Sequence, residues 1–241
     1  MLQMVKKNRG KTKPVDYELK FVFNNPISDL VLDYIRSRCL PGPLFPYGVV
    51  SSIYFDTRNW RLLGEKINSD YFKCKYRIRW YSEFDHGGFG EFTFIEIKKK
   101  IGTSREKKRI KSGIPGKFLD NADLNSEVFF NIASILRAEG ELFYENLFPV
   151  FQISYKRWRF VEPITNTRLC IDSDISIPKV NELLFPMTTP FSLKNGVLEV
   201  KGSFDDLPDP LHKIELLGCR KESFSKYKYC FEKLNEIFHI A

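Results

Sequence analysis

The chain has 241 residues, and its 38 Lys and Arg residues outnumber its 30 Asp and Glu residues, which gives a formal net charge of +8. Apolar residues make up 43% of the chain and aromatic residues 15%, a composition that excludes a disordered protein. No run of 18 apolar residues is present, and residues 1–15 lack the apolar stretch of a signal peptide, so we expect no membrane insertion.

Hydrophobic periodicity predicts an α+β protein with eight strands and three helices. In chain order, the strands are expected at residues 16–23, 49–56, 72–81, 91–100, 150–160, 166–175, 196–202 and 212–218. The helices are expected at residues 27–39, 125–148 and 222–240, where apolar residues recur at helical spacing. No long linker divides residues 16–241, which we therefore interpret as a single domain.

Six of the expected strands carry charged residues two positions apart, and therefore on one face. This alternation fits an antiparallel sheet whose charged face lies in water. It also fits a closed barrel whose charged face points inward, because the long amphipathic helices need an outer apolar surface to cover. A lumen lined with Arg and Lys would then require a polyanion, with carboxylates and metal for balance.

The surplus positive charge is concentrated in two segments. Residues 1–15 contain five bases and no acid, and residues 98–111 contain eight bases and one acid. We interpret residues 1–15 as a flexible basic tail. The second segment suggests an anionic partner, although a charge run is also typical of a solvated surface.

Cysteine and histidine positions exclude several kinds of site. The five cysteines are widely spaced and form no C-x-x-C pair, which indicates a reducing, cytoplasmic compartment. The three histidines are scattered, so no zinc site can be identified. The G-x-x-x-x-G-K-[ST] phosphate loop is absent.

An ordered set of short motifs extends over most of the chain. These are D-Y-E-L-K (16–20), Y-F-D-T (54–57), K-Y-R-I-R (75–79), E-I-K-K-K (96–100), K-R (108–109), Y-K-R (155–157), R-L-C-I-D (168–172), L-E-V-K (198–201) and S-K-Y (225–227). Together they resemble the VTC domain, the polyphosphate polymerase domain of the triphosphate tunnel metalloenzymes, a superfamily that also includes the CYTH phosphatases. The S-K-Y motif resembles the VTC branch in particular.

The resemblance implies a closed tunnel of eight antiparallel strands, with the charged side chains inside and the helices outside. It implies catalytic roles for Lys20, Arg77, Arg79, Lys98 and Lys201. It implies phosphate binding by Lys75, Lys100, Arg109, Arg157, Arg168, Ser225 and Lys226. It implies that Glu199, with Glu18 and Glu96 as further candidates, holds Mn²⁺ or Mg²⁺. Two local alternatives stay open: Asp56 is expected to be a turn or cap residue, and Ser225 could cap the last helix.

The function expected from the resemblance is metal-dependent transfer of the terminal phosphate of a nucleoside triphosphate onto inorganic polyphosphate. Phosphoryl transfer of this kind depends on positioning and charge neutralisation, which Arg, Lys and a hard cation supply. One alternative is a triphosphate or polyphosphate hydrolase with the same tunnel, and another is a non-catalytic polyphosphate-binding module. Nucleic-acid binding ranks last, because no nucleic-acid motif accompanies the basic segments.

Overall fold

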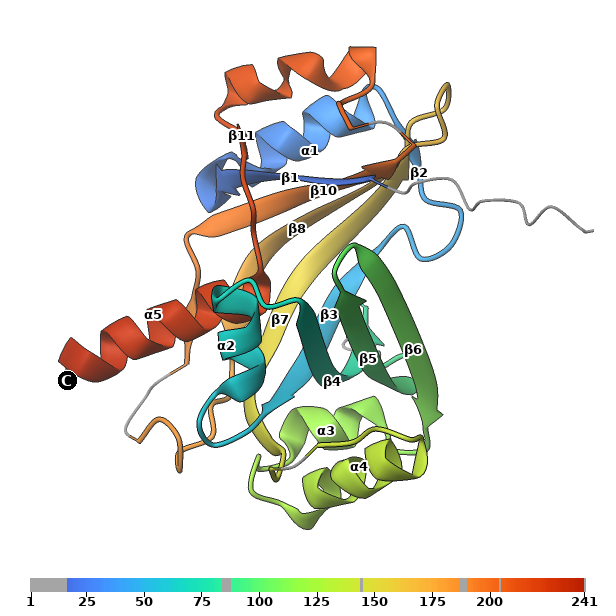
Figure 1. The fold of residues 1–241 in the computed structure, drawn as a ribbon. Coiled ribbons are helices and arrows are strands. Elements are labelled where there is room, and N and C mark those ends of the chain that lie inside the picture. Colours follow the sequence, from blue (N-terminus) through green and yellow to red (C-terminus); the bar gives the residue numbers. More distant parts are fainter. Residues whose placement is uncertain (1–16, 84–87, 144, 187–189, 204, 241) are drawn as a thin grey trace, which may run out of the picture.

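A computed structural model describes residues 17–240, apart from 84–87, 144, 187–189 and 204 (Figure 1). The expected basic tail, residues 1–15, lies outside the described residues. Within them, no helix combines the length and the apolarity needed to cross a membrane. The five cysteines form no disulfide, and four of them are buried as small core residues.

One antiparallel sheet forms the centre of the molecule. Its long strands are β1 (Tyr17–Asn24), β3 (Tyr47–Asp56), β4 (Phe72–Ser82), β5 (Thr93–Ile101), β6 (Ser104–Ser112), β7 (Phe148–Val161), β8 (Arg168–Ile177) and β10 (Asn195–Gly202). Three short strands are β2 (Leu40–Pro41), β9 (Phe191–Ser192) and β11 (Arg220–Lys221). The order is β11-β1-β10-β8-β7-β3-β4-β5-β6, with β2 beside β7 and β9 beside β8.

Most of the helices cover the apolar outer face of this curved sheet, as the sequence predicts, but the last helix begins against the concave face. The helices are α1 (Ser28–Arg36), α2 (Arg61–Ile67), α3 (Gly116–Asn121), α4 (Glu127–Ala138) and α5 (Lys226–Ile240), with the 3₁₀ helices η1 (Asn25–Ile27) and η2 (Asp209–Leu217). In Figure 1, α1 and η2 cover β1, β10 and β8 at the top, and α3 and α4 cover the sheet at the bottom. The charged residues lie on the opposite, concave face, which the start of α5 also contacts: Tyr227 stacks on Tyr54 of β3, with ring centroids 4.8 Å apart.

The prediction of a closed barrel is not confirmed, because the described strands form an open sheet with edges at β6 and β11. Part of the edge of β1 that a closing strand would need is already paired, since Phe21 and Val22 lie opposite β11. The contact across the remaining opening is between side chains: Arg105 of β6 and Glu18 of β1 form an ion pair of 3.7 Å. We call this opening between β6 and β1 the seam.

One predicted strand is wrong, one predicted helix is too long, and the strand β6, the three short strands and the helices α2 and α3 were not predicted. Residues 212–218 lie mostly in η2 rather than in a strand, because the buried residues Leu211 and Ile214 are three apart, the period of a 3₁₀ helix. The predicted helix 125–148 ends at Ala138, followed by Gly140 at a φ of 86°. The residues of β6 were identified from the sequence only as part of the basic segment 98–111, not as a strand.

Candidate functional site

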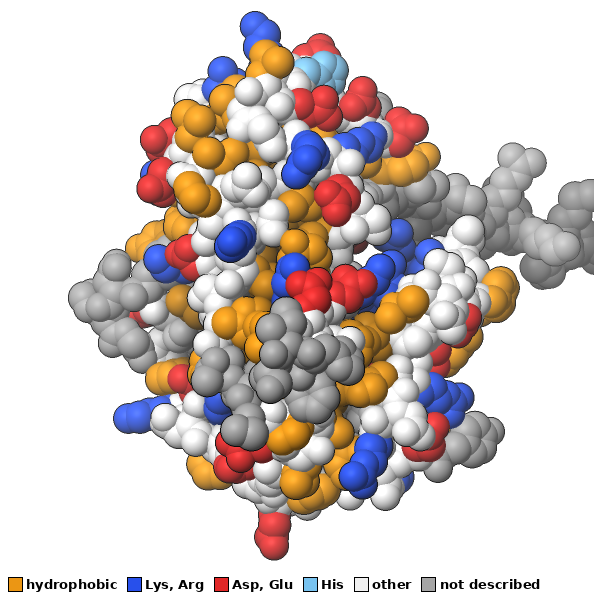
Figure 2. Space-filling view, turned by 90° about the vertical axis from the view of Figure 1, so that its left-hand side faces the viewer, with side chains coloured by type: hydrophobic (Ala, Val, Ile, Leu, Met, Phe, Trp, Pro, Cys, Tyr) orange, Lys and Arg blue, Asp and Glu red, His pale blue; other side chains and the backbone are white. Residues whose placement is uncertain are grey.

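The charged residues that alternate along the long strands gather on the concave face of the sheet. Residues two apart share a face, and the strand register places these charges opposite one another on neighbouring strands. Figure 2 shows basic and acidic side chains lying side by side near the middle of the face that it views. The charged groups form two clusters, one around Glu96 and one around Asp172 and Glu199.

The arginine cluster surrounds Glu96 of β5, whose side chain is fully buried. Arg77 Nε donates to Glu96 Oε2 at 2.8 Å, and Arg109 Nε donates to Oε1 at 2.9 Å. Lys107 Nζ lies 2.8 Å from Oε1 and Arg79 Nη1 lies 3.7 Å from Oε2. Burial opposes ionisation of Glu96, but Arg77 and Arg79 outweigh it and hold the pKa of this carboxyl well below its usual range.

Hydroxyl groups fix the guanidinium groups of the same cluster. Arg77 Nη1 donates to Tyr54 Oη at 2.9 Å, and Arg79 donates to Ser52 Oγ at 2.9 Å and to Tyr155 Oη at 3.2 Å. Arg77 and Arg79 are buried, with exposed fractions of 8% and 6%. Their positions are therefore set before any ligand binds, which is the arrangement that electrostatic catalysis requires.

The carboxylate cluster joins β7, β8 and β10 to the start of α5. Arg157 binds both oxygens of Asp172 through Nε and Nη2, at 2.5 and 2.6 Å. Lys226 Nζ lies 2.5 Å from Asp172 Oδ2 and 3.2 Å from Glu199 Oε1. Burial opposes ionisation, but Arg157 and Lys226 lower the pKa of both carboxyl groups.

Glu18 and Lys20 of β1 extend the carboxylate cluster to the seam. Lys20 Nζ lies 3.4 Å from Glu18 Oε1 and 3.9 Å from Glu199 Oε1, and it donates to the Phe224 carbonyl at 2.8 Å. Lys201 Nζ lies 3.8 Å from Glu18 Oε2. Lys20 therefore lies between Glu18 and Glu199, two of the three carboxylates that the resemblance assigns to metal binding.

Two lysines on the concave face have lowered pKa values. For Lys75, burial and the neighbouring Lys66 and Lys20 lower the pKa to about 7. For Lys98, the Arg77 charge followed by burial lowers the pKa to about 6. Neither lysine forms an ion pair with a carboxylate in the described part of the chain. The charge of Asp56 near Lys75, and that of Glu96 near Lys98, offset the neighbouring positive charges only in part.

The start of α5 contributes the residues of the S-K-Y motif. Ser225 Oγ accepts from the Lys228 backbone N–H at 3.5 Å and from Lys75 Nζ at 3.2 Å, so it lies at the helix start and also contacts the concave face. Asp56 is a cap residue, as expected: its carboxylate accepts from the backbone N–H groups of Leu62 and Leu63 in α2.

The remaining predicted residues lie at the ends of the strands. Arg168 is exposed and lies opposite Lys201 in the register of β8 and β10. Lys100 lies opposite Lys73 on one side and Arg105 on the other. The structure thus brings all the predicted site residues to the concave face, its strand ends or the start of α5.

The metal assignments separate into two cases. Among the described residues, no three His, Cys, Asp or Glu side chains form a group that could hold a metal ion. Glu96 does not fit a metal ligand, because donors from Arg77, Arg109 and Lys107 fill its acceptor sites. Glu18 and Glu199 fit better, because Mg²⁺ is commonly held by one or two carboxylates together with phosphate oxygens.

Several residues of the site were not identified from the sequence. Lys107 was read as a surface residue but contacts Glu96, and Arg105 reaches Glu18 across the seam. The alternation of bases at 105, 107, 109 and 111 was the available signal. Arg159, Tyr54 and Tyr155 also line the concave face; the two tyrosines begin the Y-F-D-T and Y-K-R motifs, but no role was assigned to them.

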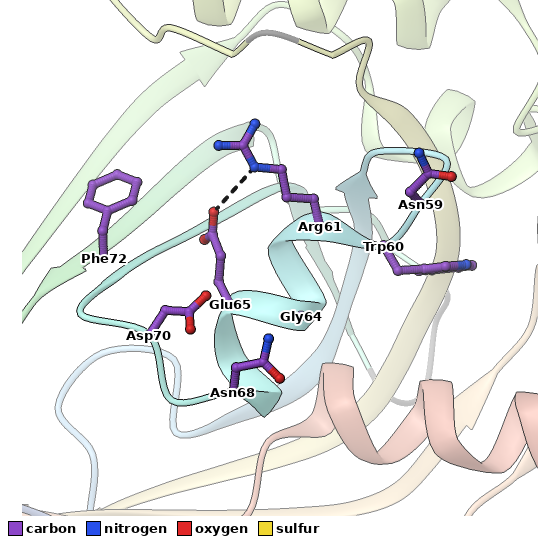
Figure 3. Close-up of a pocket in the computed structure, with 8 residues that line it drawn as sticks. All are labelled: Asn59, Trp60, Arg61, Gly64, Glu65, Asn68, Asp70 and Phe72. Atoms are coloured by element: carbon purple, nitrogen blue, oxygen red, sulfur yellow. Dashed lines mark ion pairs between the residues drawn. The ribbon is translucent and has the colours of Figure 1, made fainter.

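A pocket of about 480 Å³ lies beside α2, away from both clusters (Figure 3). In Figure 3, Arg61 and Glu65 face each other along the helix, with Arg61 Nε 4.0 Å from Glu65 Oε1. Glu65 also accepts from the Cys74 backbone N–H at 2.9 Å, which fixes α2 against β4. We interpret this pocket as part of the packing of α2 rather than as the site.

Comparison with known proteins gives one family match and several similar folds. The VTC domain family matches residues 17–235. The PH1819 protein of Pyrococcus horikoshii is 13% identical, with a TM-score of 0.50 over 91% of this chain and 99% of that chain. A candidate adenylate cyclase from Vibrio parahaemolyticus is 13% identical, with a TM-score of 0.46 over 92% of this chain and 97% of that one. No curated protein matches.

Proposed function

The chain belongs to the VTC domain family, and on that premise we propose that it is a divalent-metal-dependent phosphotransferase. It moves the terminal phosphate of a nucleoside triphosphate onto inorganic polyphosphate held on the concave face. The observation that carries the proposal is the concentration of basic side chains there: Lys75 and Lys98 form no ion pair among the described residues, and nearby positive charge contributes to their lowered pKa values. A polyphosphate chain would supply the missing negative charge.

The arginine cluster supports binding of the transferred phosphate. Arg77 and Arg79 are buried and fixed by tyrosine and serine hydroxyls, so their N–H groups are oriented in advance. Lys107 and Arg109 are more exposed, at 44% and 41%, and can turn from Glu96 toward a phosphate. Arginine forks bind phosphate oxygens in pairs, and lysine adds a point charge.

Glu18 and Glu199 are the residues that would hold Mg²⁺ or Mn²⁺. In the ligand-free structure both form ion pairs with Lys20. When substrate binds, the Lys20 ammonium group can leave these carboxylates and pair with a phosphate oxygen instead. The metal would neutralise phosphate charge during transfer. Glu96 has no part in this proposal, since its own neighbours are four cations.

The carboxylates of the site are too weakly basic to act as the general base that a hydrolase would need. Their cationic neighbours lower the pKa values of Asp172 and Glu199, so neither is suited to take a proton from water. No imidazole lies on the described concave face, and His212 belongs to η2. The anionic end of a polyphosphate needs no such base.

The experiment is incubation of the full chain with ATP, Mn²⁺ and a short polyphosphate primer, followed by measurement of polyphosphate and orthophosphate. We expect polymer to form with the wild type and to be lost with Glu199→Gln. Glu215→Gln, an exposed site on η2, is the matched control. Orthophosphate without polymer would select the hydrolase instead. Phosphate binding without turnover under any metal would leave only a binding module.

A further inference from the structure

The loop 42–46, which joins β2 to β3, carries two apolar side chains into solvent. Leu44 and Phe45 have exposed fractions of 73% and 78%, and Leu40, just before the loop, is also exposed. In Figure 1 this loop projects from the body of the molecule below the label β2. Single exposed apolar residues are common on proteins, but several together on one projecting loop are typical of a contact surface.

One residue of β7, Arg159, holds this loop at three points. Its backbone N–H donates to the Pro46 carbonyl at 2.7 Å, its carbonyl accepts from the Gly42 N–H at 2.8 Å, and its guanidinium donates to the Phe45 carbonyl at 2.7 Å. Phe45 is held at a φ of 51°, a left-handed conformation that is unfavourable for a bulky side chain. Three of residues 41–46 are prolines, which restrict the backbone further. The fold therefore imposes the outward position of the apolar side chains.

The basic N-terminal segment of the chain joins the sheet at the same end as this loop. One row of paired residues crosses five strands there, from Leu40 of β2 through Val161, Arg168 and Lys201 to Glu18 of β1. Neighbouring strands are about 4.8 Å apart, so β1 begins within about 20 Å of Leu40. Residues 1–15, which precede β1, contain five bases and no acid. Positive charge and exposed apolar surface are therefore attached to one end of the sheet.

The residues around the loop are also basic. Residues 34–55 contain no acid, and Arg38, whose guanidinium lies 3.8 Å from the centre of the Tyr34 ring, forms no ion pair with a carboxylate among the described residues. The turn between β7 and β8 adds Ile164, which is exposed as well. An apolar tip with bases beside it complements a bilayer surface that carries anionic lipid, because the headgroups take the bases and the hydrocarbon boundary takes the tip.

We propose that this end of the molecule binds the surface of a membrane that contains anionic lipid, with Leu44 and Phe45 inserted at the boundary between headgroups and acyl chains. Each signal is weak by itself, and stable attachment requires an apolar and a basic one together. The attachment involves one face of the bilayer only and requires no spanning segment. This inference does not depend on the proposed phosphotransfer.

The test is flotation of the full chain with vesicles of phosphatidylcholine alone and with vesicles that also contain phosphatidylserine. We expect the wild type to bind the second kind more tightly, and added salt to weaken that binding. The variant Leu44→Ser with Phe45→Asn removes the apolar tip, and Asn tolerates the left-handed φ. It is expected to bind at least about tenfold more weakly. The matched control is Leu142→Ser with Leu216→Ser, which removes two exposed apolar side chains from other parts of the surface.

A second variant, Lys7→Gln with Lys11→Gln, tests the basic segment. It is expected to weaken binding to the phosphatidylserine vesicles at least about fivefold and to leave binding to phosphatidylcholine unchanged. Thermal unfolding of each variant separates loss of binding from loss of fold. Three results would overturn the inference: no binding of the wild type to anionic vesicles, equal binding by the variant of the apolar tip, or a wild-type dimer that this variant converts to a monomer in light scattering. In the last case the loop contacts a second copy of the chain.

Discussion

Tyr227 Oη donates a hydrogen bond of 2.7 Å to Asp56 Oδ2, and this contact joins α5 to the end of β3. Asp56 is fully buried, and its carboxylate also accepts from the first turn of α2. Burial raises the pKa of Asp56, and the Tyr227 hydroxyl and the backbone N–H groups oppose that rise. Because α5 carries Lys226 and α2 carries Lys66, this single carboxylate positions both helices that border the site.

The first prediction concerns this contact. Tyr227→Phe removes the hydroxyl donor from a buried carboxylate and is expected to lower the free energy of unfolding by about 1–2 kcal/mol. Urea denaturation measures it. Tyr229→Phe is the control, because Tyr229 Oη donates to a neutral partner, Asn195 Oδ1, in a less buried position. A loss for Tyr227→Phe no larger than that for Tyr229→Phe would contradict the role assigned to Asp56.

The second prediction concerns Glu96. Glu96→Gln leaves Arg77, Arg79 and their neighbours without their common anion and is expected to destabilise the ligand-free protein by about 3 kcal/mol. Because phosphate can replace the lost carboxylate, tripolyphosphate should raise the unfolding temperature of this variant more than that of the wild type. Thermal scans with and without tripolyphosphate measure both effects. An equal rise in the two proteins would argue against phosphate binding at the arginine cluster.

The sequence predicted the strands that alternate apolar and charged residues, but not β6. On that strand the alternation of Arg105, Lys107 and Arg109 is matched by charged Glu106 and Lys108 on the other face, so no apolar period is present. Lys108 instead pairs with Glu139 of α4 at 2.6 Å. Charge on both faces is typical of an edge strand, which has less apolar cover than a central one.

The sequence motifs identified most residues of the site, but they did not predict which of these residues contact one another. Lys226 contacts Asp172 and Glu199 only because the chain folds the start of α5 against two strands, and nothing local in the sequence encodes that distance. The predicted closure of the barrel is not confirmed, and the edge of the open sheet also depends on residues far apart in the sequence. The pairing of β11 with β1 depends on Arg220 and Lys221, a two-residue strand without a recognisable pattern.

The third prediction concerns metal binding. If Glu18 and Glu199 hold the cation together with phosphate oxygens, Glu199→Gln should weaken Mn²⁺ binding in the presence of tripolyphosphate by at least about tenfold. Electron paramagnetic resonance of free Mn²⁺ measures this without turnover. Glu215→Gln serves again as the matched control. Unchanged Mn²⁺ affinity in Glu199→Gln would exclude this carboxylate as a ligand.

The last prediction concerns the pH dependence caused by Lys75. Its pKa in the folded protein is about 7, lowered by burial and by Lys66, Lys20 and Arg77, with Asp56 acting in the opposite sense, against an ordinary value of 10.5. Between these values the unfolded chain holds a proton that the folded chain lacks, so this group makes stability rise with pH from about 7 to about 10. Lys75→Met should remove that rise and increase stability at neutral pH by about 1 kcal/mol.

Polyphosphate binding should have the opposite pH dependence, because a bound anion favours the charged lysine. At pH 8 the wild type should therefore take up protons when it binds long-chain polyphosphate, whose interior phosphates do not titrate in this range. Calorimetry in two buffers of different ionisation enthalpy measures the uptake, and Lys75→Met should reduce it. A heat of binding that is the same in both buffers would show that no proton is taken up. The lysines of the concave face would then be charged before polyphosphate binds, which contradicts the lowered pKa of Lys75.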